Sequence, residues 1–142
     1  MAKKPKLLKL CVEFSLFPDN TVLGPAFQLG GFSFSQPVGA PNMFVNDTAG
    51  ERGLQFPNQG MNVNLPAPTR RLTMRVGSFA GPFDIAAING TGATVAMRTV
   101  NSNNTYTNIS MSSPNGDIVA LEFKGGNNEG FLVKLCVQLA LC

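Results

Sequence analysis

The three cysteines are the residues of this chain whose spacing suggests a specific chemistry. They are Cys11, Cys136 and Cys142, in a 142-residue sequence that contains no histidine. Cys11 and Cys136 each lie in a run of alternating apolar residues, on the phase opposite the apolar one. If the strands that carry them were antiparallel neighbours, the two cysteines could form a disulfide, because the Cα spacing of opposed residues falls within the disulfide range. Reduced thiols are the alternative, since the sequence shows no secretion signal and disulfides follow the redox compartment.

Cys142 is the last residue and has no obvious internal partner in the sequence. An odd cysteine at a chain end indicates an intermolecular disulfide or a free thiol. The three residues before it, Leu139-Ala140-Leu141, are apolar, although chain ends usually fray unless they dock against something. These features favour self-association through the terminal strands and Cys142.

Catalytic chemistry has little support in this composition. Without histidine, Ser–His and Cys–His nucleophile pairs cannot form, and three cysteines cannot complete a four-ligand structural zinc site. Glu13, Asp84, Glu122 and Glu129 are candidates for a glycosidase carboxylate pair only because they are acids. We therefore expect a protein that is not an enzyme.

Sugar binding is the second chemistry to consider. A sugar-binding face generally needs an exposed aromatic ring, most often Trp or Tyr, and this chain has no Trp and one Tyr. Tyr106, with Asn104 and Asn108 beside it on one strand face, forms the best available platform. The alternative is an ordinary outward-facing strand with polar neighbours, and the eleven Phe are better explained as core.

Calcium is the one cofactor for which the sequence offers ligands. The ion takes six to eight oxygens, including carboxylates, and Asp19, Asn20, Asp47 and Glu129 could converge at loop ends. No ligand loop of fixed spacing is present. Turn residues that hydrogen-bond their own backbone are the alternative interpretation, so we expect either no cofactor or calcium.

The elements that would position these residues are strands. Apolar residues alternate with other residues in two long runs: Leu8, Leu10, Val12, Phe14 and Leu16, and Phe131, Val133, Leu135, Val137 and Leu139. Shorter runs lie at 32–34, 43–45, 61–65, 72–76, 83–87, 95–97, 109–111 and 119–123. Gly, Pro and Asn separate them, and Asn-Gly pairs at 89–90 and 115–116 predict hairpins. The pattern predicts an all-β, single-domain antiparallel β-sandwich of the jelly-roll type with about eight to eleven strands.

The layout from about residue 8 to residue 139 resembles jelly-roll β-sandwich modules of the galactose-binding-like and carbohydrate-binding type. The matching stretches are Cys11-Val12-Glu13-Phe14, Gly31-Phe32-Ser33-Phe34, residues 72–77, residues 117–123 and residues 130–137. The resemblance implies that the first and last strands are neighbours. It also implies a family in which many members bind sugars and many carry a structural calcium ion.

The positive charge of the chain is a property of its first residues. Four of the eleven Lys and Arg lie within residues 1–10, and the formal net charge is +3. We assign residues 1–6 to a basic arm and residues 7–142 to the β-sandwich domain. Arg70, Arg71 and Arg75 form the only other basic cluster, so we expect no nucleic-acid partner. No apolar stretch is long enough to span a bilayer, so we expect no membrane insertion.

These observations favour a structural protein that self-associates into a surface, filament or particle-like assembly. Its main partner would be a second copy of the chain, and it would be extracellular or on a cell, spore or particle surface. No signal peptide is visible, because Lys9 and Glu13 interrupt the apolar segment that one requires. A carbohydrate-binding module with a glycan partner, calcium-dependent or not, is the alternative.

Overall fold

Residues 6–141 are described by the computed structural model, and they form thirteen strands and one 3-10 turn. The strands are β1 (Lys6–Glu13), β2 (Val22–Gly24), β3 (Ala26–Leu29), β4 (Phe32–Ser35), β5 (Met43–Thr48), β6 (Glu51–Phe56), β7 (Met61–Thr69), β8 (Arg71–Ser78), β9 (Phe83–Asn89), β10 (Thr94–Val100), β11 (Tyr106–Ser112), β12 (Ile118–Gly125) and β13 (Gly130–Leu141). The count exceeds the eight to eleven expected because β2 and β3 are too short to show an alternation. β1 begins at Lys6, which the sequence analysis had assigned to the basic arm.

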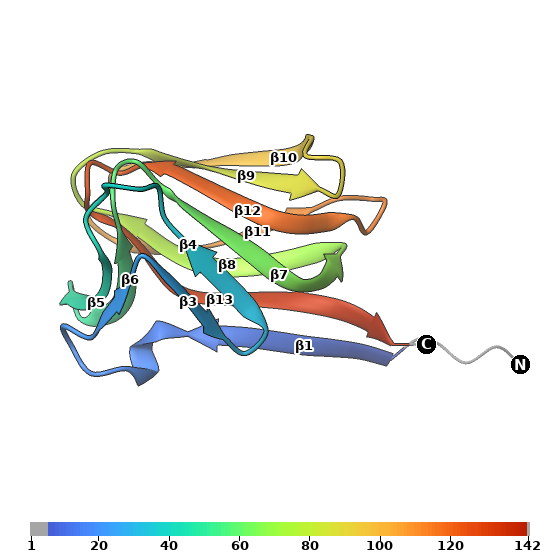
Figure 1. Cartoon of the computed structure of the whole chain (residues 1–142), viewed down its shortest axis with the longest axis horizontal. Coiled ribbons are helices and arrows are strands. Elements are labelled where there is room, and N and C mark those ends of the chain that lie inside the picture. Colours follow the sequence, from blue (N-terminus) through green and yellow to red (C-terminus); the bar gives the residue numbers. More distant parts are fainter. Residues whose placement is uncertain (1–5, 142) are drawn as a thin grey trace, which may run out of the picture.

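Two antiparallel sheets pack against each other, so the prediction of an all-β sandwich is confirmed (Figure 1). The six-stranded sheet has the order β10-β9-β12-β7-β4-β3. The seven-stranded sheet has the order β11-β8-β13-β6-β5-β2, and β1 also pairs with β13. From β4 onward the chain passes repeatedly from one sheet to the other, which is how jelly rolls connect their layers.

The twelve-residue strand β13 has two partners along one of its edges. Its first residues pair with β6, from Gly130 opposite Phe56 to Leu132 opposite Leu54. From Lys134 onward that edge pairs with β1, which lies beside β13 at the lower edge of the molecule in Figure 1. The terminal strands are therefore neighbours, as the resemblance implied.

The core lies between the sheets and is built mainly from phenylalanine and aliphatic side chains of the alternating runs. Fully buried members include Phe14, Phe32, Phe34, Phe56, Phe83 and Phe123. The ring pairs Phe14–Phe34, Phe56–Phe83 and Phe56–Phe123 meet edge-on, with centroids 5.5, 5.0 and 5.4 Å apart, within the preferred range for aromatic pairs. The prediction that the Phe residues form the core is confirmed for this set.

The prediction that Phe131, Val133, Leu135 and Val137 share one buried face of β13 is wrong. Relative to β8, the register shifts between Leu132 and Lys134, which marks a β-bulge. Leu132, Leu135 and Val137 lie in the main core, whereas Phe131 and Val133 pack on the outer side of the seven-stranded sheet. The extra residue at the bulge moves every later side chain of the strand to the opposite face. One unbroken alternation in the sequence therefore places Phe131 and Val133 on the outer face and Leu135 and Val137 in the core.

Three other apolar residues do not lie where alternation placed them. Leu16 is 78% exposed because β1 ends at Glu13 and a 3-10 turn (Phe14–Leu16) follows. Met97 is 63% exposed, in a strand whose register shifts between Thr94 and Ala96. In β12 a bulge between Ile118 and Ala120 buries Ile118 and leaves Val119 half-buried.

Only one of the two Asn-Gly pairs closes a hairpin. Asn89 ends β9, and its side-chain oxygen accepts hydrogen bonds from the amides of Thr91 and Ala93 before β10 returns alongside. Asn115-Gly116 instead connects β11 to β12, which lie in different sheets. Both Asn-Gly pairs form turns, but the turn at Asn115-Gly116 carries the chain from one sheet to the other.

Candidate functional site

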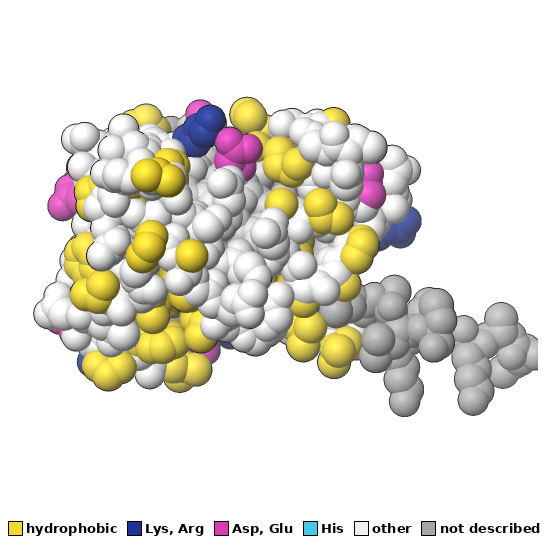
Figure 2. Space-filling view, in the orientation of Figure 1, with side chains coloured by type: hydrophobic (Ala, Val, Ile, Leu, Met, Phe, Trp, Pro, Cys, Tyr) yellow, Lys and Arg dark blue, Asp and Glu magenta, His cyan; other side chains and the backbone are white. Residues whose placement is uncertain are grey.

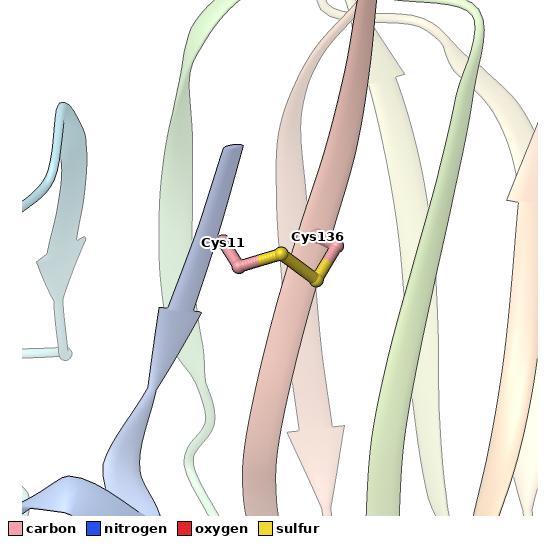
Figure 3. The surroundings of a disulfide bond; sticks show 2 residues. All are labelled: Cys11 and Cys136. Carbon is pink, nitrogen blue, oxygen red and sulfur yellow. A yellow bond between two sulfur atoms is a disulfide. The ribbon is translucent and has the colours of Figure 1, made fainter. Parts of the chain in front are cut away.

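The outer face of the seven-stranded sheet carries two of the three cysteines, together with Tyr106 and Asn108. Cys11 lies directly opposite Cys136, and the two form a disulfide across β1 and β13 (Figure 3). Their Cα atoms are 4.1 Å apart, and the bond joins residues separated by 125 positions. The predicted disulfide is therefore present. Cys142 lies outside the described residues.

Arg75 is the centre of a polar network on the same face. Its Nε and one terminal nitrogen donate to the two carboxylate oxygens of Glu51, both at 2.6 Å, and its other nitrogen donates to Oδ1 of Asn108 at 3.1 Å. The hydrogen bonds from Arg75 hold the pKa of Glu51 below its ordinary value and raise that of Arg75. A bidentate pair of this kind fixes geometry as well as charge, so β8, β11 and β6 are tied together at one point.

Tyr106 does not offer the exposed ring that a sugar platform requires. Its side chain is 8% exposed and packs against Phe79 and Phe131, with ring centroids at 5.3 and 6.2 Å. The hydroxyl donates to the carbonyl oxygen of Thr48 at 2.9 Å. Burial raises the pKa of Tyr106 to about 12, and the nearby carboxylates of Glu51 and Asp47 add to the effect.

The two asparagines of the expected platform occupy different settings. Asn108 is exposed on β11, where it accepts the hydrogen bond from Arg75. Asn104 is exposed in the turn before β11, with a positive φ of 53° and an amide that donates to the carbonyl of Ser78. The two asparagines are therefore exposed, but the tyrosine ring that they were expected to flank is buried.

The calcium candidates are only partly brought together. The Asp19 carboxylate accepts a hydrogen bond from the amide of Asp47 at 2.8 Å, while the Asp47 carboxylate lies 3.5 Å from Nε of Arg52. Glu129 lies in the turn before β13, where its carbonyl accepts from the amide of Phe79. Within residues 6–141, no group of three or more Asp, Glu, His or Cys is placed to hold a metal ion.

Two adjoining hollows follow the outer face beside the disulfide. The first has a volume of about 410 Å³ and is lined by Lys9, Glu13, Thr73, Met74, Arg75, Asn108, Lys134 and Cys136. The second, of about 370 Å³, shares Glu13, Arg75 and Lys134 with it and continues toward Glu51 and Arg52. We call the two together the outer groove.

The lysines of the outer groove, Lys9 and Lys134, were not among the site residues predicted from the sequence. A signal was present, because Lys9 and Glu13 share the phase of Cys11, and Lys134 shares the phase of Cys136. The partner of Arg75 could not be found in this way. Glu51 lies 24 residues away in the sequence and in a strand that does not pair with β8.

Comparison with known proteins bears on the fold. No protein-family model matches the chain, and no curated protein matches its sequence. The CBM29_1 family 29 carbohydrate-binding module from Piromyces equi superposes with a TM-score of 0.57 at 7% identity, covering 96% of this chain and 93% of that one. The apo form of BiXyn10A CBM1 superposes with a TM-score of 0.50 at 13% identity, covering 91% and 96%. The chain has the β-sandwich fold of these carbohydrate-binding modules.

A weaker likeness is to a chain of the Bacillus endospore appendages, described as disulfide-linked pili. It has a TM-score of 0.46 at 10% identity and covers 99% of this chain and 93% of that one. In the part of the chain that the structure describes, no helix has the length and apolar character needed to cross a membrane.

Proposed function

We propose that this chain is a structural, non-enzymatic β-sandwich that self-associates through its terminal strands, on the outside of a cell, spore or particle. The observation that carries the proposal is the outer edge of β1. β1 pairs with β13 along its whole length, and on its other side no paired strand is found among the described residues. An unpaired strand edge is a ready template for a strand of another chain.

The geometry of the disulfide identifies which backbone groups β1 offers. A Cα separation of 4.1 Å is typical of a non-hydrogen-bonded antiparallel pair, so the amide and carbonyl of Cys11 point away from β13. By strand periodicity the same holds for Lys9 and Glu13. The backbone amide and carbonyl groups of these three alternate residues of β1 can therefore hydrogen-bond to an incoming strand.

A second copy of β1 fits this edge with complementary charges. If two β1 strands pair antiparallel about Cys11, each Lys9 faces the Glu13 of the other copy on the same sheet face. This arrangement is a twofold interface in which one surface complements itself. Opposite charges directly across a strand pair stabilise it by about 0.2–1 kcal/mol each.

The turn between β3 and β4 lies beside the same edge. A Cβ on Gly30 would stand 4.0 Å from the carbonyl oxygen of Cys11. Gly30 and Gly31 have no side chains to extend into the space that an incoming strand would occupy.

Charge reversal tests this interface. We expect Lys9→Glu to weaken self-association roughly two- to thirtyfold, because two ion pairs are lost per dimer and each is replaced by repulsion. The double variant Lys9→Glu with Glu13→Lys should restore it. Sedimentation equilibrium of the wild type and the variants measures the dissociation constants, and Lys124→Glu on the six-stranded sheet is the control.

A wild-type chain that stays monomeric at high concentration would overturn the proposal, whether or not a reductant is present. Loss of association in the double variant would refute the specific register. We also propose that Cys142 locks contacts between copies once they form. Cys142→Ser should then abolish disulfide-linked dimers on non-reducing gels and leave the noncovalent equilibrium unchanged.

Carbohydrate binding is the second candidate, and the outer groove is the observation that favours it. The groove offers charged groups together with uncharged hydrogen-bonding groups, without the exposed ring that the sequence had suggested. Pairing of β1 edges uses the backbone groups in the plane of the sheet and a glycan would lie on its face, but both would contact the side chains of Lys9 and Glu13.

A further inference from the structure

The two free lysines of the outer groove carry an inference about its ligand that deepens the carbohydrate-binding candidate and rests on it. Arg75 already has its charge balanced by the bidentate contact with Glu51. Among the described residues, no carboxylate lies within ion-pair distance of Lys9 or Lys134. With Arg75 paired to Glu51 and Arg52 to Asp47, the groove is left with two ammonium groups and one carboxylate, that of Glu13, which lies opposite Lys134.

The spacing of the lysines favours a polymer over a small anion. Lys9 lies opposite Gln138 and Lys134 lies opposite Glu13, so the two are four residues apart along the strand pair. At the rise of a β-strand this is about 14 Å. With both side chains standing away from the sheet, one carboxylate or sulfate contacts one ammonium group, whereas a chain with repeated anionic groups contacts both.

The other polar groups of the groove can hydrogen-bond to the hydroxyls of a ligand. Thr73 lies opposite Cys136 and is exposed between the two lysines, and Asn108 is exposed at the level of Lys134. The Asn108 oxygen is occupied by Arg75, which leaves its amide nitrogen to donate. The carboxylates of Glu13 and Glu51 accept hydrogen bonds from hydroxyls but repel a dense row of phosphates. This chemistry suits a ligand that alternates carboxylates with hydroxyl-bearing carbons and disfavours nucleic acid.

We propose that the outer groove binds an acidic polysaccharide, in which uronate carboxylates contact Lys9 and Lys134 and sugar hydroxyls contact Thr73, Asn108 and Glu13. No aromatic platform is needed, because charge and hydrogen bonds supply the attraction. Binding of this kind weakens as salt rises, since the contacts are solvent-exposed.

Titration calorimetry with the full chain tests the proposal, using an octamer of galacturonic acid, a trimer of it, and a neutral dextran oligomer. We expect the octamer to bind more tightly than the trimer and the dextran not to bind. Lys9→Gln with Lys134→Gln should weaken octamer binding about tenfold. The matched control is Lys124→Gln, a 70% exposed lysine outside the groove, which should change binding less than twofold.

Each other outcome overturns the inference. Absence of octamer binding in 50 mM salt, equal binding of dextran, or an unchanged affinity in the double lysine variant would each refute it. Tighter binding of a single-stranded oligonucleotide than of the octamer would identify a nucleic-acid partner instead. Thermal melting of each variant checks the fold, and measuring wild-type self-association in the same buffer separates failure of this inference from failure of the edge-pairing proposal.

Discussion

The phenol of Tyr106 joins three parts of the seven-stranded sheet. It belongs to β11, its ring packs against Phe131 of β13, and its hydroxyl donates to Thr48 at the end of β5. The Arg75 guanidinium lies 5.9 Å from the ring centroid, within the range of a cation–π contact. Burial disfavours the charged phenolate, and this raises the pKa of Tyr106 to about 12.

Replacing this hydroxyl has a predictable effect. Tyr106→Phe should lower the free energy of unfolding by about 1 kcal/mol at pH 7, because the Thr48 carbonyl loses its donor. The tyrosine's pKa is higher in the folded than in the unfolded chain, so its contribution is complete below pH 10 and is lost as pH rises toward 12. Urea titrations from pH 7 to 11.5 should show this alkaline decline in the wild type and a smaller one in the variant. Parallel curves for the two proteins would contradict the account.

At the scale of the element, β8 depends on one residue without a side chain. Gly77 lies opposite Tyr106 on one side and opposite Phe131 on the other. A Cβ there would come within 2.8 Å of both the Thr105 carbonyl oxygen and Cδ1 of Tyr106. The glycine therefore makes room for two large rings that pack over the strand, in the small cluster outside the main core.

Gly77→Ala should destabilise the fold by about 1–3 kcal/mol, because either the ring or strand β11 must shift to admit a methyl group. Gly90→Ala is the matched control, since a Cβ at that position meets nothing within 4 Å. We expect the control to stay within about 0.5 kcal/mol of the wild type. Denaturant unfolding measures both, and equal effects of the two substitutions would show that Gly77 is not a close-contact site.

At the scale of the whole molecule, the Cys11–Cys136 bond encloses almost the entire chain in one loop. The two cysteines are 125 residues apart in sequence, yet they lie opposite each other in paired strands. A covalent link over so long a loop restricts the unfolded chain strongly. It also holds β1 against β13, so the edge offered for self-association depends on it.

Reduction should therefore lower the free energy of unfolding by about 2–5 kcal/mol. Thermal melts with and without a phosphine reductant measure the change in Tm, and Cys11→Ser with Cys136→Ser should reproduce the reduced value. Cys142→Ser, measured under oxidising conditions, keeps this disulfide and serves as the control. A melting temperature unaffected by reductant would show that strand pairing alone holds the termini.

A low density of charge is a second property of the whole molecule. Only 13% of the residues are charged, and Figure 2 shows a face made mostly of uncharged polar and backbone atoms with scattered apolar side chains. On such a surface the cluster of Lys9, Glu13, Arg75 and Lys134 is conspicuous. Both the edge-pairing proposal and the groove proposal draw on it.

The sequence by itself determined the class of fold. Alternation with a period of two is a local property, and it identified the terminal strands, the Phe-rich core and the phase of Cys11 and Cys136. It failed at β10, β12 and β13, where bulges reverse the phase, because an extra residue is visible only against the strand that it pairs with.

Only the tertiary structure decided which polar residues meet. It buried Tyr106, which the sequence pattern places on an outward strand face, joined Glu51 to Arg75, and placed Lys9 and Lys134 in one groove. The physical reason is that local pattern shows which face of a strand a side chain is on but not what covers that face. Phe79 and Phe131 cover Tyr106, and both come from other segments of the chain. Burial and ion pairing are set by segments distant in sequence, which become neighbours only when the sheets assemble.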